Sequence, residues 1–201
     1  NEFSTKVLEV LRQPMEDKIV TISRARGSLT FPANFMLVAA HNPCPCGYHG
    51  DPVRPCTCSP TMVARYQSKL SGPLLDRIGI HIDVPRVEYD KLMSSERGES
   101  SLAVRKRIES AREHQRKRFA NFPGLVANAD MNAGEVQQLC AAEDEARKLL
   151  EVSVRQLQLS ARAYHRILKL GRTIADMEHS RFIQAAHVAE AIQYHPKAQE
   201  G

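Results

Sequence analysis

Four cysteines lie close together in the first third of the chain, within the run CPCGYHGDPVRPCTC. They form two Cys-x-Cys pairs separated by nine residues, and they are Cys44, Cys46, Cys56 and Cys58. Four thiolates can surround a tetrahedral zinc ion, and a site with four protein ligands leaves no open position for catalysis. The spacing therefore predicts a structural zinc site, with His41 and His49 as nearby replacement ligands. A redox-active pair, or reduced cysteines without a metal, are the alternatives.

Several polar side chains follow apolar runs at positions where they could act on a phosphate group. Asn42 comes two residues after the run FMLVAA, so we expect its amide at the carboxyl end of a buried strand, where α/β sheets bind ligands. Arg77 lies just before a second strand-like run, and Arg162 and Arg166 share one face of a predicted helix. Taken singly, each of these residues also fits a turn, a surface position or a structural ion pair.

Two further arginines lie near the tip of a predicted β-hairpin. The run KIVTISRARGSLTF contains two β-type segments around Ala25, Arg26 and Gly27, with Arg24 beside this turn. Arginine suits contacts to a nucleic acid backbone, because phosphates supply affinity without demanding a base sequence. Arginines that are simply solvated on an exposed hairpin are the alternative. The formal net charge of +5 agrees with a polyanionic partner such as DNA, and equally with a surface kept basic for solubility.

These candidates require a framework of helices and strands. Helical spacing predicts a helix over residues 3–13 that stops at Pro14, and the continuous apolar run at 35–40 predicts a strand buried on both faces. A Cys-rich loop follows at 42–60. A helical pattern then covers 61–77, with a break at Ser71–Pro73, and the run IGIHIDVP predicts another strand. We therefore expect an α/β structure in this part of the chain.

The rest of the chain has helical periodicity throughout. The predicted helices cover about 101–120, 132–153, 158–176 and 184–194, after the polar segment ERGESS. This pattern predicts two domains, an α/β domain at 1–95 and an all-α domain at 96–201. With 201 residues, of which 42% are hydrophobic, the chain can bury a core. It has neither a signal-peptide pattern nor an apolar run of about 20 residues that could cross a bilayer, so we expect a cytoplasmic protein without membrane contact.

Long runs of the sequence resemble the magnesium-chelatase-like AAA+ ATPases of the YifB/ComM type. The resemblance spans nearly the whole chain and is carried by VTISRA, FPANFMLVAAHNPCPCGY, LSGPLLDRI and LSARAYHRILKLGRTIAD. It implies a partial AAA+ α/β core, with helix, β-hairpin and buried strands, followed by an all-α helical lid. It also implies that Asn42 is the sensor-1 residue and that Arg77, in LLDR, is an arginine finger acting on a neighbouring subunit. Arg162, in SAR, corresponds to sensor 2, with Arg166 in reserve.

The resemblance implies a larger protein than this chain. The sequence contains neither a GxxxxGK[ST] phosphate loop nor the acidic pair that holds magnesium, and in the relatives that pair lies just before the segment matching Asn1–Phe3. We therefore expect a C-terminal part that alone binds ATP poorly and hydrolyses essentially none. The implied parent protein uses ATP with Mg²⁺, assembles into a hexameric ring and works on DNA, and its hairpin arginines would touch nucleic acid in the pore.

Two other functions stay open from the sequence. The first is a zinc-stabilised module that binds nucleic acid without ATP chemistry. The second is the ATPase motor of a metal chelatase, which the family name suggests.

Overall fold

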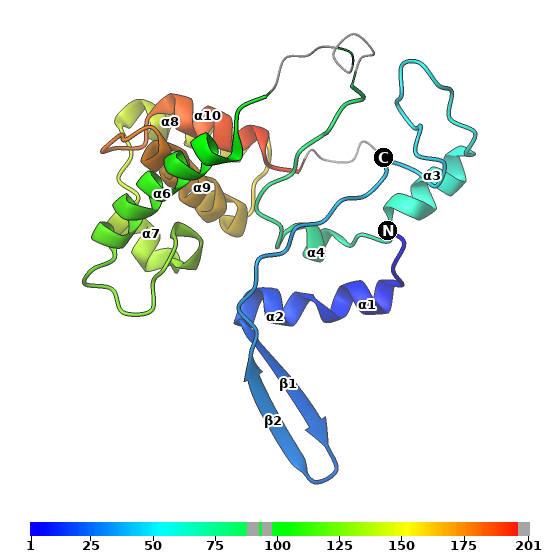
Figure 1. The fold of residues 1–201 in the computed structure, drawn as a ribbon, viewed down its shortest axis with the longest axis horizontal. Coiled ribbons are helices and arrows are strands. Elements are labelled where there is room, and N and C mark those ends of the chain that lie inside the picture. The colour runs from blue at the N-terminus through cyan, green and yellow to red at the C-terminus, as the bar shows by residue number, and fades with distance from the viewer. Residues whose placement is uncertain (88–92, 94–97, 197–201) are drawn as a thin grey trace. The chain divides into compact units, whose positions relative to one another are not determined.

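The computed structural model describes residues 1–87, 93 and 98–196, and its backbone is drawn in Figure 1. The chain divides into two compact units, Asn1–Ile78 and Gly79–Gly201, and each is described by itself. The domain boundary predicted between residues 95 and 96 lies outside the described residues.

The first unit begins with two short helices, α1 (Thr5–Val10) and α2 (Arg12–Asp17). The prediction of one helix that stops at Pro14 is wrong, because the break falls at Leu11 and Pro14 lies inside α2. Pro14 occupies the first turn of that helix, where a missing backbone N–H removes no intrahelical hydrogen bond.

The predicted hairpin is confirmed. Strands β1 (Ile19–Arg24) and β2 (Gly27–Pro32) pair antiparallel, from Ile19 opposite Pro32 to Arg24 opposite Gly27. All residues of both strands are exposed, and Figure 1 shows the hairpin extending away from α2.

The two faces of the hairpin differ in chemistry. Side chains alternate along a strand, so one face carries the hydroxyl pairs, Thr21 with Thr30 at 3.1 Å and Ser23 with Ser28 at 2.9 Å. The opposite face carries apolar cross-strand pairs, namely Val20 with Phe31 and Ile22 with Leu29.

The two other predicted strands are wrong for this structure. Residues 35–40 and 78–85 have no strand assignment, and Met36 and Val38 are 88% and 86% exposed. A strand buried on both faces needs hydrogen-bonded neighbours and covering layers. In the described residues the only sheet consists of β1 and β2, so neither run has a strand to pair with.

Two capped helices complete the first unit, α3 (Pro60–Gln67) and α4 (Gly72–Leu75). The side chain of Ser71 accepts a hydrogen bond from the backbone N–H of Leu74 and caps α4, and Pro73 lies in its first turn. The two helical segments are separate, as predicted, but the break falls at residues 68–71, and Gly72 and Pro73, which were assigned to the break, lie inside α4.

The second unit is mainly helical from Ser101 onward in its described residues, as predicted for that part of the chain, whereas residues 79–87 have no helix or strand. It contains α6 (Ser101–Arg118), the 3₁₀ turn η1 (Asn128–Asp130), α7 (Ala133–Leu139), α8 (Asp144–Gln156), α9 (Ala161–Met177) and α10 (Ala185–Gln193). The single helix predicted over 132–153 is wrong, because α7 and α8 are separate. Between them Ala142 forms an isolated parallel bridge with Ile183, and the N–H of Ile183 donates to the carbonyl of Ala141 at 2.9 Å. A residue paired in this way cannot continue a helix.

Helix α9 lies at the centre of the second unit and packs against α6, α7 and α10. Its start is set by Ser160, whose side chain accepts a hydrogen bond from the N–H of Ala163 at 3.1 Å. Its apolar stripe, including Ile167 and Ile174, packs in the core with Val136 and Val188. None of the helices in the described part of the chain is long and apolar enough to cross a membrane.

Candidate functional site

The four predicted metal ligands lie together. Their four Sγ atoms lie within 4.8 Å of one another, and all four residues are free cysteines. Cys44 is fully buried, and the other three are half-buried. This four-cysteine cluster could hold a metal ion.

Backbone groups of the same loop point at the sulfurs. The N–H of Cys58 donates to Cys56 Sγ at 3.4 Å. The backbone N–H groups of Tyr48 and Thr57 donate to the sulfur of Cys46 and lower the pKa of that thiol to about 5. Hydrogen bonds to the charged form of a group favour that form, so the loop favours a thiolate at Cys46.

Asn42, the predicted sensor-1 residue, lies on the surface just before the four-cysteine cluster. His41 Nδ1 donates to the backbone carbonyl of Asn42 at 3.0 Å. The Asn42 side chain lies near Gly47, where an added Cβ would be 3.9 Å from Asn42 Cγ. Asn42 therefore follows a segment without strand assignment and not the buried strand that we expected.

Arg77, the predicted arginine finger, comes directly after α4 and is largely buried, with 17% of its side chain exposed. Its NH1 donates to the carbonyl of Pro73 at 2.6 Å, and its NH2 pairs with the carboxylate of Glu16 in α2. Its buried Nε has no hydrogen-bond partner within the described part of the chain. Only part of the guanidinium is therefore satisfied by the surrounding protein.

The guanidinium of Arg77 borders an open depression of about 340 Å³. The lining residues are Glu9, Arg12, Gln13, Glu16, Asp17 and Arg77. Ser71 donates to Glu9 at 2.6 Å, and this hydrogen bond and those from Arg12 lower the pKa of the Glu9 carboxyl. Three carboxylates against two guanidiniums make the depression acidic.

The two predicted sensor-2 candidates lie one turn apart on α9, in the second unit. Arg162 is exposed in the first turn of α9, directly after the Ser160 cap. Arg166 is half-buried and lines a small hollow of about 10 Å³ together with Gly79, His195 and other residues. A hollow of that size holds at most a water molecule.

The two predicted nucleic-acid contacts are exposed at the end of the hairpin. Arg24 is the last residue of β1, and Arg26 lies in the two-residue connection to β2. The structure thus brings these two arginines to one tip, away from the helices of their unit (Figure 1).

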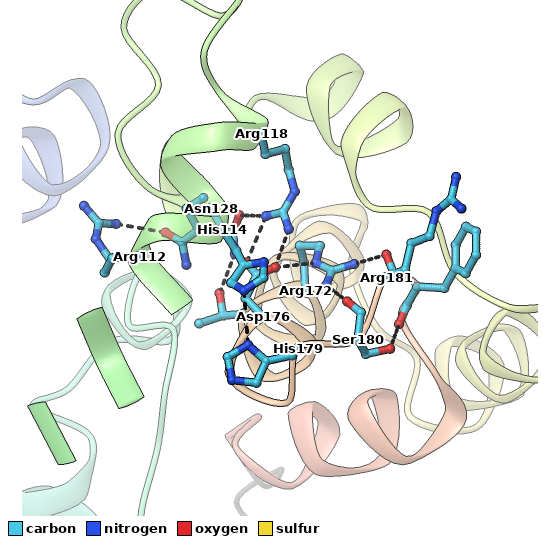
Figure 2. Close-up of polar contacts among 12 residues, drawn as sticks. Arg112, His114, Arg118, Asn128, Arg172, Asp176, His179, Ser180 and Arg181 are labelled. Carbon is cyan, nitrogen blue, oxygen red and sulfur yellow. Dashed lines mark hydrogen bonds and ion pairs between the residues drawn. The ribbon is translucent and has the colours of Figure 1, made fainter. Parts of the chain in front are cut away.

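Sequence reasoning missed a buried charge network in the second unit. Figure 2 shows the carboxylate of Asp176 between the guanidiniums of Arg118 and Arg172. Arg118 NH1 donates to Asp176 Oδ2 at 2.8 Å, and Asn128 Nδ2 donates to the same oxygen at 2.9 Å. Arg172 also donates to the carbonyls of Ser180 and Arg181, at 2.6 and 2.8 Å. The network therefore joins α6, η1 and α9 to the turn that follows α9.

The protonation of Asp176 is set by this network. Burial by itself would raise the pKa of the Asp176 carboxyl, but hydrogen bonds from Arg118 and Asn128 lower it overall. The 1% exposure of Asp176 explains why these donors matter, since an ionised carboxylate out of water must be paired. Only the Arg172–Asp176 pair, at i,i+4 on α9, had a signal in the sequence.

Comparison with known families matches both parts of the chain. A profile described as "Magnesium chelatase, subunit ChlI" matches residues 1–92, and one described as "Magnesium chelatase, subunit ChlI C-terminal" matches residues 98–195. The two matched segments belong to one family and together cover nearly the whole sequence.

Curated relatives agree with this result. The chain is 43% identical over 195 residues to the competence protein ComM of Haemophilus influenzae, and 40% identical over 195 residues to the uncharacterized protein YifB of Escherichia coli. An uncharacterized protein of Mycobacterium tuberculosis is 33% identical over 193 residues. Each alignment covers 96% of this chain but only 37% or 38% of the relative, so the chain spans little more than a third of their length. The chain belongs to the magnesium-chelatase-like family that includes ComM and YifB.

Proposed function

We propose that this chain is part of a ring-forming AAA+ ATPase that couples ATP hydrolysis to work on DNA. The observation that carries the proposal is the incomplete hydrogen bonding of the Arg77 side chain. The family to which the chain belongs supplies the context for this observation. Arg77 lines an open depression, and its buried Nε–H has no acceptor among the residues that the structure describes. By contrast, Arg118 and Arg172 are tied into a closed network around Asp176. An arginine that must reach a phosphate on another subunit has to be held in place while some of its N–H groups remain available for that phosphate.

The other predicted residues receive roles in the same proposal. Asn42 orients the attacking water as sensor 1, and Arg162 contacts the nucleotide as sensor 2, with Arg166 as the reserve candidate. The cofactors of the whole protein are ATP with Mg²⁺. This sequence contains no GxxxxGK[ST] loop. We therefore assign contacts to the nucleotide's phosphates only to the residues named above.

Work on DNA is supported by the hairpin. Arg24 and Arg26 lie at an exposed tip, where two guanidiniums can contact phosphates without reading the bases. Ring assembly follows from the role of Arg77, because an arginine finger needs a neighbouring subunit.

Replacement of Arg77 by Ala in the full-length protein tests the proposal. We expect ATP binding to be retained and hydrolysis to fall by roughly 10³-fold or more, since an arginine finger contributes on that scale. Arg12→Ala is the matched control, because Arg12 lines the same depression and pairs with Glu9. Equal turnover in the wild-type and Arg77→Ala proteins would refute the role of Arg77.

A mixing experiment tests whether Arg77 acts between subunits. Neither Asn42→Ala nor Arg77→Ala protein alone should hydrolyse ATP. In mixed rings, a subunit that retains Asn42 can meet a neighbour that retains Arg77, so activity should reappear. No recovery in rings shown to be mixed would contradict an action of Arg77 in trans.

A second candidate function is a zinc-stabilised nucleic-acid-binding module without ATP chemistry. It is favoured by the fact that the hairpin arginines and the four-cysteine cluster both lie in the unit Asn1–Ile78. A full-length protein that binds DNA but hydrolyses no ATP would favour this module. The family name also suggests a metal-chelatase motor, which predicts ATP hydrolysis that DNA does not stimulate.

A further inference from the structure

Three sulfurs of the four-cysteine cluster have a spacing close to that of a metal centre, and the fourth, of Cys58, lies within 4.8 Å of them. Cys44 Sγ lies 3.3 Å from Cys46 Sγ and 3.7 Å from Cys56 Sγ, and the latter two are 3.5 Å apart. With Zn–S bonds of about 2.3 Å, the sulfurs of a tetrahedral zinc site lie about 3.8 Å from each other. A disulfide would need about 2.05 Å. The spacing is thus near that of a tetrathiolate site and far from that of a disulfide.

The loop backbone brings the two Cys-x-Cys pairs to the same point. In the first pair, Gly47 has φ +83 and donates its N–H to the carbonyl of Cys44 at 3.0 Å, which turns the chain back after Cys46. In the second pair, the N–H of Cys58 points at the sulfur of Cys56. Backbone N–H groups directed at ligating sulfurs are the outer hydrogen bonds that tune and orient metal ligands.

The segment between the pairs has its own local order. Asp51 Oδ1 accepts the backbone N–H groups of Val53 and Arg54, each at 2.8 Å. The Arg54 guanidinium lies 4.1 Å from the centre of the Tyr48 ring and donates to its hydroxyl at 2.7 Å. These contacts are exposed and local, so they do not tie the loop to a core. A cross-link at the base of the loop would supply the long-range constraint that these contacts do not provide.

The chemistry of the cluster narrows the choice of metal. Four thiolates in a tetrahedral arrangement suit zinc or iron, whereas carboxylate and carbonyl oxygens suit magnesium and calcium. Fully buried Cys44 and three half-buried partners form a closed set, with no position left for a substrate.

We infer that Cys44, Cys46, Cys56 and Cys58 bind one Zn²⁺ ion, which closes the loop 42–60 as a structural cross-link and takes no part in bond-breaking chemistry. The inference is independent of ATP hydrolysis and holds under either candidate function. It also gives the loop a role in holding the chain just after Asn42, since Cys44 is only two residues away.

Metal analysis of the full 201-residue chain tests this inference. Protein purified without chelator should contain one equivalent of zinc, and the double variant Cys56→Ser/Cys58→Ser should contain almost none. Cys140→Ser is the matched control, because it removes a buried thiol outside the cluster and should leave the zinc content unchanged. Zinc below half an equivalent in the wild-type chain, iron in its place, or equal zinc in the double variant would overturn the inference.

A second measurement uses only the wild-type chain, so that misfolding of a variant cannot decide the result. Titration with an organomercurial reagent should release one zinc ion as four thiols react, and a metallochromic dye reports the release. Co²⁺ added to the metal-free chain should produce a thiolate-to-cobalt charge-transfer band that saturates at one equivalent. Failure of both signals would also overturn the inference.

Discussion

Arg77 and Glu16 are 61 residues apart in the chain, yet their side chains form an ion pair that joins the end of α4 to α2. Glu16 belongs to an acidic depression, and its carboxylate occupies one side of the Arg77 guanidinium. If Arg77 acts as an arginine finger, it must exchange this carboxylate for a phosphate on another subunit. The strength of the ion pair with Glu16 would then set how readily Arg77 moves to that phosphate.

Glu16→Gln in the full-length protein should raise the rate of ATP hydrolysis. An ion pair that is partly exposed contributes about 0.2–1 kcal/mol, so we expect kcat to rise by roughly 1.5–5-fold with little change in ATP affinity. Steady-state hydrolysis assays measure both quantities. Asp17→Asn, which removes an adjacent carboxylate of the same depression, is the control. A lower kcat in Glu16→Gln would mean that the carboxylate positions Arg77 for the reaction and does not restrain it.

Replacement of both hairpin arginines should weaken DNA binding in a salt-dependent way. Each phosphate contact that is lost lowers the slope of log K against log salt by about 1, so Arg24→Ala/Arg26→Ala should reduce the slope by about 2. Fluorescence anisotropy at several salt concentrations measures this slope. Arg147→Ala/Arg155→Ala removes the same charge from exposed positions of α8 and should leave the slope unchanged. Identical slopes in the wild type and the hairpin variant would exclude the tip as a DNA contact.

Asp176→Asn should strongly destabilise the helical unit. Loss of the carboxylate leaves Arg118 and Arg172 without their shared partner, and breaking a buried ion pair in this way costs about 3–5 kcal/mol. Urea unfolding followed by circular dichroism measures the change. Glu151→Gln, which breaks an exposed pair with Arg155, should alter the free energy of unfolding by less than about 0.5 kcal/mol. Similar losses of unfolding free energy in both variants would contradict the argument that the Asp176 ion pairs matter because they are buried.

The same network predicts how stability depends on pH. The pKa of Asp176 is lowered in the folded chain, so its contribution is fully present above the unfolded value of about 3.9. It is lost as pH falls through the lower folded-state pKa, because protonation then removes the charge between the two arginines. Urea midpoints measured at decreasing pH should therefore fall more steeply for the wild type than for Asp176→Asn. Parallel pH profiles would show that other carboxyls cause the acid unfolding.

Removal of zinc should expose the cysteine loop to protease. Without the cross-link the loop keeps the exposed contacts around Asp51 and Tyr48 and the hydrogen bond from Gln67 Nε2 to the carbonyl of Pro43. Chymotrypsin cleavage after Tyr48 should therefore accelerate by roughly tenfold or more after chelation. Mass spectrometry of timed digests measures the rate. Cleavage after Tyr164 in α9 is an internal control and should not change. An unaltered rate at Tyr48 would indicate that the loop is ordered without metal.

The sequence predicted best what depends on near neighbours. The hairpin is specified by its turn at Ala25–Gly27 and alternating strands, and α9 by the Ser160 cap and its apolar stripe. The cysteine cluster also lies within one short loop, so spacing alone was informative. The strands predicted at 35–40 and 78–85 were wrong. An apolar composition favours burial but does not identify the segments that must pair with such a strand.

Distant charge pairs could not be predicted either. Nothing in the local pattern links Glu16 to Arg77, or Arg118 to Asp176 across 58 residues. Helical spacing offers a signal only for the pair within one helix, Arg172 with Asp176, and that signal was not used. Burial decides which of many carboxylates meets a given arginine, and burial is a property of the folded chain.

The hairpin also has a mechanical consequence, because it continues directly from α2 through Lys18. The N–H of Ala33 donates to the carbonyl of Lys18 at 2.7 Å and closes the base of the ribbon, while the hydroxyl pairs tie its two strands together. Six residues per strand give a lever about 20 Å long. A rotation of α2 by about 10° would move the tip by about 3.5 Å, close to the spacing of successive nucleotides along one DNA strand. If the hairpin moves rigidly with α2, a small rotation of the helix that carries Glu16 would thus be magnified at Arg24 and Arg26 to a distance comparable to one nucleotide step.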